Sequence, residues 1–211
     1  METLLQKIQD RILEFDLEGA SSATEEALSS GVKVEDILSK GIGSAMGEIG
    51  LRYERCEFFV SELVMGGSVV KQLLEKVLSP IRQTDKAMFK GKVVIGTVEG
   101  DLHDIGKMIV TSFLLGTGFD VIDLGVDVSA KRFTEAVAKE KADIVAMSCL
   151  LTTTLPSIEK VVDSLKAAGI RSKVKVLIGG HATNAEYAEK IGADGYGSDG
   201  PDAVKKALAL L

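Results

Sequence analysis

The strongest chemical feature of this sequence is a single histidine held between two aspartates. In the segment VEGDLHDIGK, His103 follows Asp101 by two residues and directly precedes Asp104. A neutral imidazole binds a metal through one nitrogen, and a carboxylate bonded to the other nitrogen fixes the tautomer and strengthens the ligand. Asp101 has the spacing for that supporting role. Gly106, in the first turn of the following predicted helix, would let a large group approach the backbone.

One imidazole is a weak site for a free divalent ion, and no other His or Cys lies close enough in sequence to complete a zinc site with His103. A metal already held by a macrocycle needs only one axial ligand from the protein, as haem iron does. One histidine would then be sufficient. The alternative is a capping cluster, in which Asp104 caps the helix and His103 is incidental.

Two more segments carry unusual residues. The segment SCLLTTT, which begins at Ser148, follows a strand that reads as fully buried, and it offers several hydroxyls to a polar but uncharged ligand. Thr154 alone would serve as an ordinary N-cap before the helix that starts Leu-Pro. In the segment IGGHAT, Gly179 and Gly180 remove side chains where a cofactor would enter, although a tight turn also explains such a pair.

Composition narrows the function classes. The net charge is −6 and the 25 basic residues are spread along the chain, so no basic face for nucleic acid or anionic lipid is evident. Cys56 and Cys149 form neither a disulfide framework nor a CxxC motif, so reduced thiols are expected. No apolar run approaches the roughly 20 residues of a membrane span, and the N-terminus does not read as a signal peptide. We therefore expect a cytoplasmic protein with no nucleic-acid or membrane partner.

The first part of the chain, residues 1–80, has the rhythm of helices. Its apolar residues recur at intervals of three and four, which predicts about four amphipathic helices in a small bundle. The breaks are expected near residues 16–20, at Gly31 and around residues 55–57, and Ser79-Pro80 would end the last helix. A polar stretch, residues 81–91, is interpreted as an interdomain linker.

The remaining residues, 92–211, alternate short β-branched runs with helical stretches, which predicts an α/β domain with a parallel sheet. A weak fifth strand would complete a doubly wound, five-stranded sheet of the flavodoxin-like or Rossmann-like kind, in which ligands bind beyond the carboxyl ends of the strands. The strands are expected at residues 92–97, 120–123, 143–148, 174–178 and 194–196, with helices beginning near Ile105, Ser129, Leu155, Thr183 and Pro201.

Taken together, the motifs resemble the cobalamin-binding signature DxHxxG, SxLxT and GG. Here 41 residues separate Gly106 from Ser148, and 26 separate Thr152 from Gly179, which agrees with B12-dependent methionine synthase and the corrinoid proteins of methyltransferase systems. The resemblance covers nearly the whole chain, because GLRYERCEFFVSELVMGG, residues 50–67, is similar to the helical cap of those proteins. Cys56, Ser61 and the Gly66-Gly67 pair depart from the family pattern.

The resemblance implies a role for each matching position. His103 would be the lower axial ligand of cobalt, with Asp101 and the hydroxyl of Thr154 as a proton relay behind it. Tyr53 and Val60 would cover the methyl-bearing face of the corrin and exclude water. The remaining expected cofactor-binding residues, which lie in or beside the three motifs, are Asp104, Ile105, Gly106, Ser148, Leu150, Thr152, Gly179 and Gly180.

The implied function is that of a methyl carrier. The cofactor would be cobalamin or a related corrinoid whose cobalt cycles between methyl and Co(I) forms, and the chain would have no independent catalysis. A substrate-specific methyltransferase would load the methyl group, and a second would transfer it to tetrahydrofolate or to a thiol such as coenzyme M. A reductive activase is a further expected partner.

Three alternatives accompany this reading. A cobalamin subunit of a radical mutase uses the same binding fold, but the helical cap argues against it. A B12 sensor would be expected with a basic DNA-binding module, which is not evident in this sequence. A receiver-like signalling domain would not be expected to carry the histidine of DLHDIG.

Overall fold

The computed structural model describes residues 3–78 and 89–211, in which the chain forms two compact units. The first unit comprises Met1–Lys90 and Ser112–Phe119, and the second comprises Gly91–Thr111 and Asp120–Leu211. Most of the predicted linker, residues 81–91, lies outside the described residues, as does the predicted helix end at Ser79-Pro80. The domain boundaries therefore stay a prediction.

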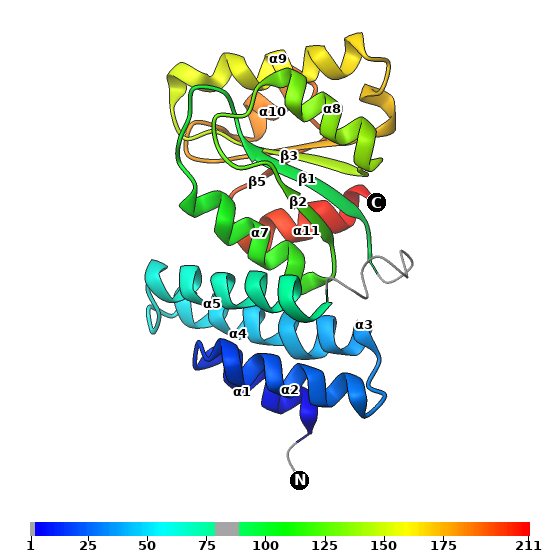
Figure 1. Ribbon diagram of the computed structural model, residues 1–211. Coiled ribbons are helices and arrows are strands. Elements are labelled where there is room, and N and C mark those ends of the chain that lie inside the picture. The colour runs from blue at the N-terminus through cyan, green and yellow to red at the C-terminus, as the bar shows by residue number, and fades with distance from the viewer. Residues whose placement is uncertain (1–2, 79–88) are drawn as a thin grey trace. The chain divides into compact units, whose positions relative to one another are not determined.

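The first unit contains a bundle of helices, as predicted (Figure 1). The four expected helices correspond to α1, to α2, to a continuous run from α3 to α4 that contains a π-helical stretch, and to α5 with its π-helical extension. Their bounds are α1 Leu4–Leu13, α2 Leu17–Ser29, α3 Val34–Asp36, η1 Ile37–Gly43, α4 Ser44–Glu54, α5 Val60–Leu73 and η2 Leu74–Leu78. The predicted break at residues 16–20 lies too late in the sequence, because the Asp16 side chain caps α2 by accepting from the Gly19 N–H.

The second unit is a parallel sheet of five strands in the order β2-β1-β3-β4-β5, as the flavodoxin-like prediction required. The strands are β1 Lys92–Thr97, β2 Asp120–Asp123, β3 Ile144–Ser148, β4 Lys175–Gly179 and β5 Gly195–Gly197. The longer helices are α7 Ile105–Thr117, α8 Ala130–Glu140, α9 Leu155–Ala167, α10 Ala185–Ile191 and α11 Gly200–Leu210. Helices α8, α9 and α10 cover one face of the sheet, and α7 and α11 cover the other (Figure 1).

Burial on both faces explains why these strands are nearly continuous apolar runs. Five of the six residues of β1 are buried, as are four of the five in β3. The largest side chains of the core between the sheet and its α8 and α9 layer include Phe133, Met147, Ile158, Leu165 and Ile178. Parallel strands must end at one edge, so the loops after β1, β3 and β4 meet there with the polar residues that the sequence marks.

Among the described residues, no helix is long and apolar enough to cross a membrane.

Candidate corrinoid site

The loop after β1 is fixed by hydrogen bonds along its whole length. The Thr97 hydroxyl donates to the carbonyl oxygen of His103 (2.8 Å). The Asp127 N–H donates to the carbonyl oxygen of Asp101 (3.0 Å), and the Asp127 carboxylate accepts from the Gly100 N–H (2.7 Å). These contacts hold the loop at both ends of the histidine segment. The histidine is therefore presented by a structured turn.

Asp101 and His103 make two contacts with each other. Asp101 Oδ1 lies 2.6 Å from His103 Nδ1 and 3.0 Å from the backbone nitrogen of His103. The aspartate side chain is completely buried, whereas the histidine side chain is 51% exposed. An ionised carboxylate has no proton to donate, so Nδ1 carries the hydrogen of this contact, and in the neutral form of the ring Nε2 has the free lone pair. In the part of the chain that the structure describes, Nε2 has no recorded protein partner.

The second oxygen of Asp101 accepts from the loop after β3. Its Oδ2 lies 2.7 Å from Leu150 N, 3.3 Å from Leu151 N and 3.5 Å from the Thr154 hydroxyl. Burial is the largest single influence on this carboxyl and on its own raises the pKa. The hydrogen bonds from Leu150, His103 and Leu151 lower the pKa. Because their combined effect is larger than that of burial, the pKa of Asp101 lies below its ordinary value. The buried group therefore stays anionic at neutral pH and polarises the imidazole.

Thr154 belongs to this network, and it does not cap α9. Its backbone is helical, and its side chain makes no capping hydrogen bond, which corrects the interpretation of this residue as an ordinary N-cap. The hydroxyl donates to the Leu151 carbonyl (2.9 Å) and lies 3.2 Å from the Cys149 sulfur. The short 3₁₀ turn Thr152–Thr154 turns this hydroxyl inward, and Thr154 is only 8% exposed. The structure thus brings Asp101, His103 and Thr154 together.

Lys107 anchors the same loop from its other side. Its side chain is only 1% exposed, and Nζ lies 2.6 Å from both carboxylate oxygens of Asp123 at the end of β2. The same Nζ is 2.7 Å from the carboxylate of Asp104, the residue after the histidine. The recorded partner of Asp104 is thus a buried cation. This ion pair ties α7 to β2 next to His103, and no pattern in the sequence indicates it beyond the lysine four residues after the histidine.

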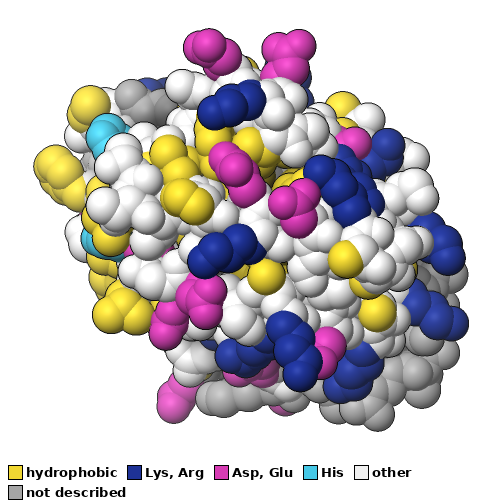
Figure 2. All heavy atoms as spheres, turned by 90° about the horizontal axis from the view of Figure 1, so that it is seen from above, with side chains coloured by type: hydrophobic (Ala, Val, Ile, Leu, Met, Phe, Trp, Pro, Cys, Tyr) yellow, Lys and Arg dark blue, Asp and Glu magenta, His cyan; other side chains and the backbone are white. Residues whose placement is uncertain are grey.

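Gly106 leaves open space beside the histidine. A Cβ built there would meet no atom within 4 Å, so packing within the described residues does not require a glycine. Four large apolar side chains in the loops after β1 and β3 and at the start of α7 are exposed to solvent. They are Leu102 (72% exposed), Ile105 (56%), Leu150 (37%) and Leu151 (40%). An open backbone and apolar side chains around one outward imidazole fit a flat, largely apolar macrocycle that lacks a single axial ligand. Figure 2 shows both histidines of the chain exposed at one margin of that view.

The glycine pair lies where β3 and β4 end side by side. Gly179 pairs with Ser148 in the sheet register. Gly180 has a φ of +106°, and a Cβ there would collide with the carbonyl oxygen of Cys149. Because of this close approach, Gly180 is required by the fold itself. The tight-turn explanation therefore applies to Gly180, and any role in cofactor binding comes in addition to it.

The other predicted residues fall into two groups. Thr152 is exposed on the loop after β3, and Ser148 is partly exposed at the end of that strand. Tyr53 (43% exposed) and Val60 (44%) belong to the first unit, on α4 and α5. Their predicted contacts with the cofactor remain proposals.

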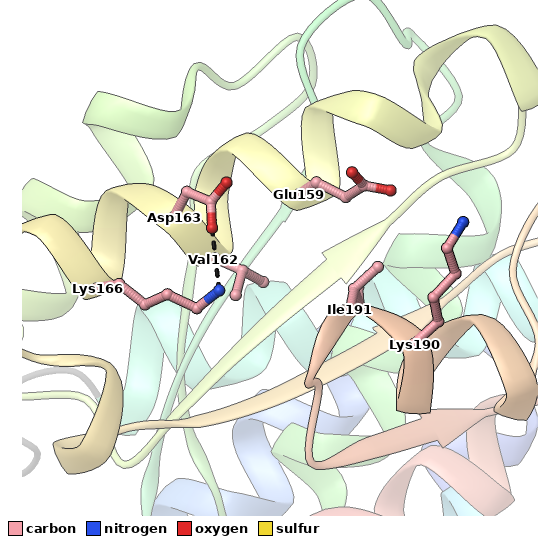
Figure 3. Close-up of a pocket in the computed structure, with 6 residues that line it drawn as sticks. All are labelled: Glu159, Val162, Asp163, Lys166, Lys190 and Ile191. Carbon is pink, nitrogen blue, oxygen red and sulfur yellow. Dashed lines mark hydrogen bonds and ion pairs between the residues drawn. The ribbon is translucent and has the colours of Figure 1, made fainter.

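A separate hollow opens between α9 and α10 (Figure 3). The residues that line this hollow are Glu159, Val162, Asp163, Lys166, Lys190 and Ile191, and none of them comes from the three motif loops. Asp163 and Lys166 pair with each other at 3.0 Å. Within residues 3–78 and 89–211, no group of three or more His, Cys, Asp or Glu side chains is arranged to hold a metal ion. The His103 loop is thus the site whose donor set has a clear chemistry.

Comparison with known proteins agrees with this site. A profile described as "B12 binding domain" matches residues 91–205, and a second profile with the same description matches residues 4–78. The chain is 40% identical to trimethylamine corrinoid protein 2 of Methanosarcina mazei over 212 residues, covering 100% of this chain and 97% of the relative. It is 37% identical to dimethylamine corrinoid protein 1 of Methanosarcina acetivorans over 210 residues, covering 100% and 98%.

A solved structure of a cobalamin-dependent system is also similar to this chain. The methanol:cobalamin methyltransferase complex MtaBC of Methanosarcina barkeri has a chain that is similar to this one with a TM-score of 0.80 and 31% identity, covering 98% of this chain and 79% of that chain.

A helical bundle followed by a flavodoxin-like sheet with an aspartate-backed histidine defines a corrinoid-binding protein. The chain belongs to the B12-binding corrinoid proteins of methyltransferase systems, and its cofactor is a cobalt corrinoid. Similarity over the full length to methylamine corrinoid proteins supports a methyl-carrying protein and does not favour a mutase subunit or a sensor.

Proposed function

We propose that this chain receives a methyl group from a substrate-specific methyltransferase that acts on a methylated amine. A second methyltransferase would then pass the group to tetrahydrofolate or to a thiol such as coenzyme M. The observation that carries the proposal is the buried, anionic Asp101 behind the outward-facing His103. Methylated amines are the donor class because the curated relatives named above are trimethylamine and dimethylamine corrinoid proteins. The complex MtaBC supports docking with a methyltransferase.

The cobalt of the bound corrinoid supplies the chemistry of accepting and releasing a methyl group. His103 would bind the cobalt through Nε2, since Nδ1 is engaged by Asp101. Asp101 keeps the hydrogen on Nδ1 and orients the ring, which raises the basicity of Nε2. Thr154 and the backbone amides of the loop after β3 hold the carboxylate in place. Gly106, Ser148, Thr152 and the glycine pair would receive the macrocycle and its nucleotide tail.

The donor is tested by loading the purified protein with hydroxocobalamin, reducing it anaerobically and following the visible spectrum. Trimethylamine, dimethylamine, monomethylamine and methanol are each supplied with a methyltransferase of that specificity. Methylation by an amine system at a rate well above the methanol system is expected. Methylation by the methanol system alone would exclude the amine donor, and no retained corrinoid would overturn the carrier function as a whole.

Tyr53 and Val60 are proposed to cover the upper face of the corrin and exclude water from the reduced cobalt. Both side chains are more than two-fifths exposed within the described residues. Exposed surface of this apolar kind is what a ligand would cover. We expect Tyr53→Ala to retain the corrinoid and to speed the oxidation of Co(I) several-fold. Leu208→Ala, at 42% exposure on α11, is the matched control. Equal rates of Co(I) oxidation in the wild type, Tyr53→Ala and Leu208→Ala would contradict the shielding role of Tyr53.

A further inference from the structure

Cys149 has contacts that the proposed function does not use. Its side chain is fully buried, and the thiol is free. Its sulfur lies 3.2 Å from the Thr154 hydroxyl and 3.3 Å from the carbonyl oxygen of Leu151. Burial raises the pKa of the Cys149 thiol, so the sulfur keeps its hydrogen at neutral pH. The thiol is therefore a hydrogen-bond donor inside the network behind His103.

Two donors of this network reach the same acceptor, the carbonyl oxygen of Leu151. Thr154 has one hydroxyl hydrogen and two acceptors in reach, the Leu151 carbonyl at 2.9 Å and Asp101 Oδ2 at 3.5 Å. The Cys149 thiol competes for the same Leu151 carbonyl. When the thiol donates to that carbonyl, the hydroxyl is released toward Asp101. When the thiol donates to the Thr154 oxygen, the hydroxyl stays on Leu151.

We propose that Cys149 is a positioning residue for the Asp101–His103 pair and acts through Thr154, by occupying the Leu151 carbonyl and directing the Thr154 hydroxyl to Asp101. The inference rests on the proposed axial role of His103. A carboxylate that receives one more donor is a weaker acceptor for the Nδ1 hydrogen. His103 then donates less electron density through Nε2, which favours Co(I) relative to Co(II).

The test compares Cys149→Ala, Cys149→Val and Cys149→Ser with the wild type, all loaded with the same corrinoid. The Co(II)/Co(I) midpoint potential is measured by spectroelectrochemistry. At the potential where the wild type is half reduced, alanine and valine should lower the Co(I) to Co(II) ratio about threefold, the size expected for one weak hydrogen bond. Serine retains a donor and should give a ratio at or above that of the wild type. Cys56→Ala removes the exposed thiol of the first unit and serves as the control.

A second background tests the route through Thr154. In Thr154→Val the hydroxyl is gone, so adding Cys149→Ala should leave the potential where Thr154→Val alone puts it. If valine matched the wild type while serine matched alanine, the residue would act only by filling space, and the proposal would be overturned. Equal potentials in all variants would overturn it as well.

Two further readouts separate this inference from the proposed function. Nitrogen superhyperfine coupling in the electron paramagnetic resonance spectrum of wild-type Co(II) reports the axial imidazole, and its absence would remove the axial role of His103. The carboxylate carbon shift of Asp101 in the cofactor-free protein needs no cobalt. It should change in Cys149→Ala and return toward the wild-type value in Cys149→Ser. An unchanged shift would contradict the role of Cys149 whatever the cofactor does.

Discussion

The two histidines of this chain follow strands of the same parallel sheet, and both are exposed to solvent. His103 follows β1 and has the buried carboxylate of Asp101 behind its ring at 2.6 Å. His181 follows β4 at the tip of a turn, and among the described residues it has no recorded hydrogen-bond or ion-pair partner. Exposure is common to both rings and does not distinguish them, so the proposal that His103 is the metal ligand rests on Asp101. A carboxylate that fixes the tautomer and direction of the ring is the usual support of a metal-binding imidazole.

The most direct way to break this comparison is to remove each ring separately. His103→Ala should abolish the imidazole nitrogen coupling of loaded Co(II) protein, since His103 is the histidine whose ring is held by a buried carboxylate. His181→Ala should leave that coupling unchanged. Electron paramagnetic resonance of the two variants measures the difference. If the coupling were lost in His181→Ala and kept in His103→Ala, His181 would be the cobalt ligand and the proposed role of His103 would be wrong.

The next largest effect should come from the anion behind His103. Asp101→Asn keeps the shape of the side chain but removes its charge, and its NH₂ group would face hydrogen-bond donors such as the Leu150 N–H. Loss of such a partner weakens binding at metal sites about 10- to 100-fold. The affinity for hydroxocobalamin, titrated by its visible spectrum, should fall by that order. Asp163→Asn, whose carboxylate is 72% exposed, is the control and should bind as the wild type does.

Two glycines of the motif loops should separate folding from binding. Gly180→Ala forces a side chain into the left-handed region and against the Cys149 carbonyl, so it should cost about 1–3 kcal/mol of unfolding free energy. Gly106→Ala meets open space in a helix and should stabilise the cofactor-free protein by up to about 1 kcal/mol. The same change should weaken corrinoid binding. Urea unfolding and spectral titration measure both quantities. A loss of stability in Gly106→Ala would show that this glycine serves the fold.

The sequence predicted the elements that local patterns control. The five strands lie within one or two residues of their predicted bounds, because buried parallel strands are short β-branched runs between helices. The resemblance to the cobalamin-binding signature also predicted that Asp101, His103 and Thr154 act together. The structure brings them together because the ends of β1 and β3 are neighbours in the sheet. The fold and the histidine loop could therefore be predicted before any coordinates.

The supporting residues could not be predicted, because their roles depend on contacts made after folding. Cys149 lies inside a recognised motif, but nothing in the sequence shows that the turn after β3 brings the Thr154 hydroxyl to its sulfur. Lys107 meets Asp123 across 16 positions and from another strand. For Thr154 the residue type alone equally suits a helix cap, and the turn geometry shows that its side chain makes no capping hydrogen bond.

The smallest effect expected is a difference in acid stability that also depends on Asp101. The pKa of this carboxyl is lower in the folded protein than in the unfolded chain. Its contribution to stability is therefore complete above the ordinary carboxyl value of about 4, and it is lost as the pH falls through the lower folded value. Asp101→Asn lacks this ionisation, so its urea midpoint should decline less steeply than that of the wild type between about pH 5 and pH 3. Parallel declines would mean that the hydrogen bonds from Leu150 and His103 do not favour the anion, and the contrast with His181 would then rest on geometry alone.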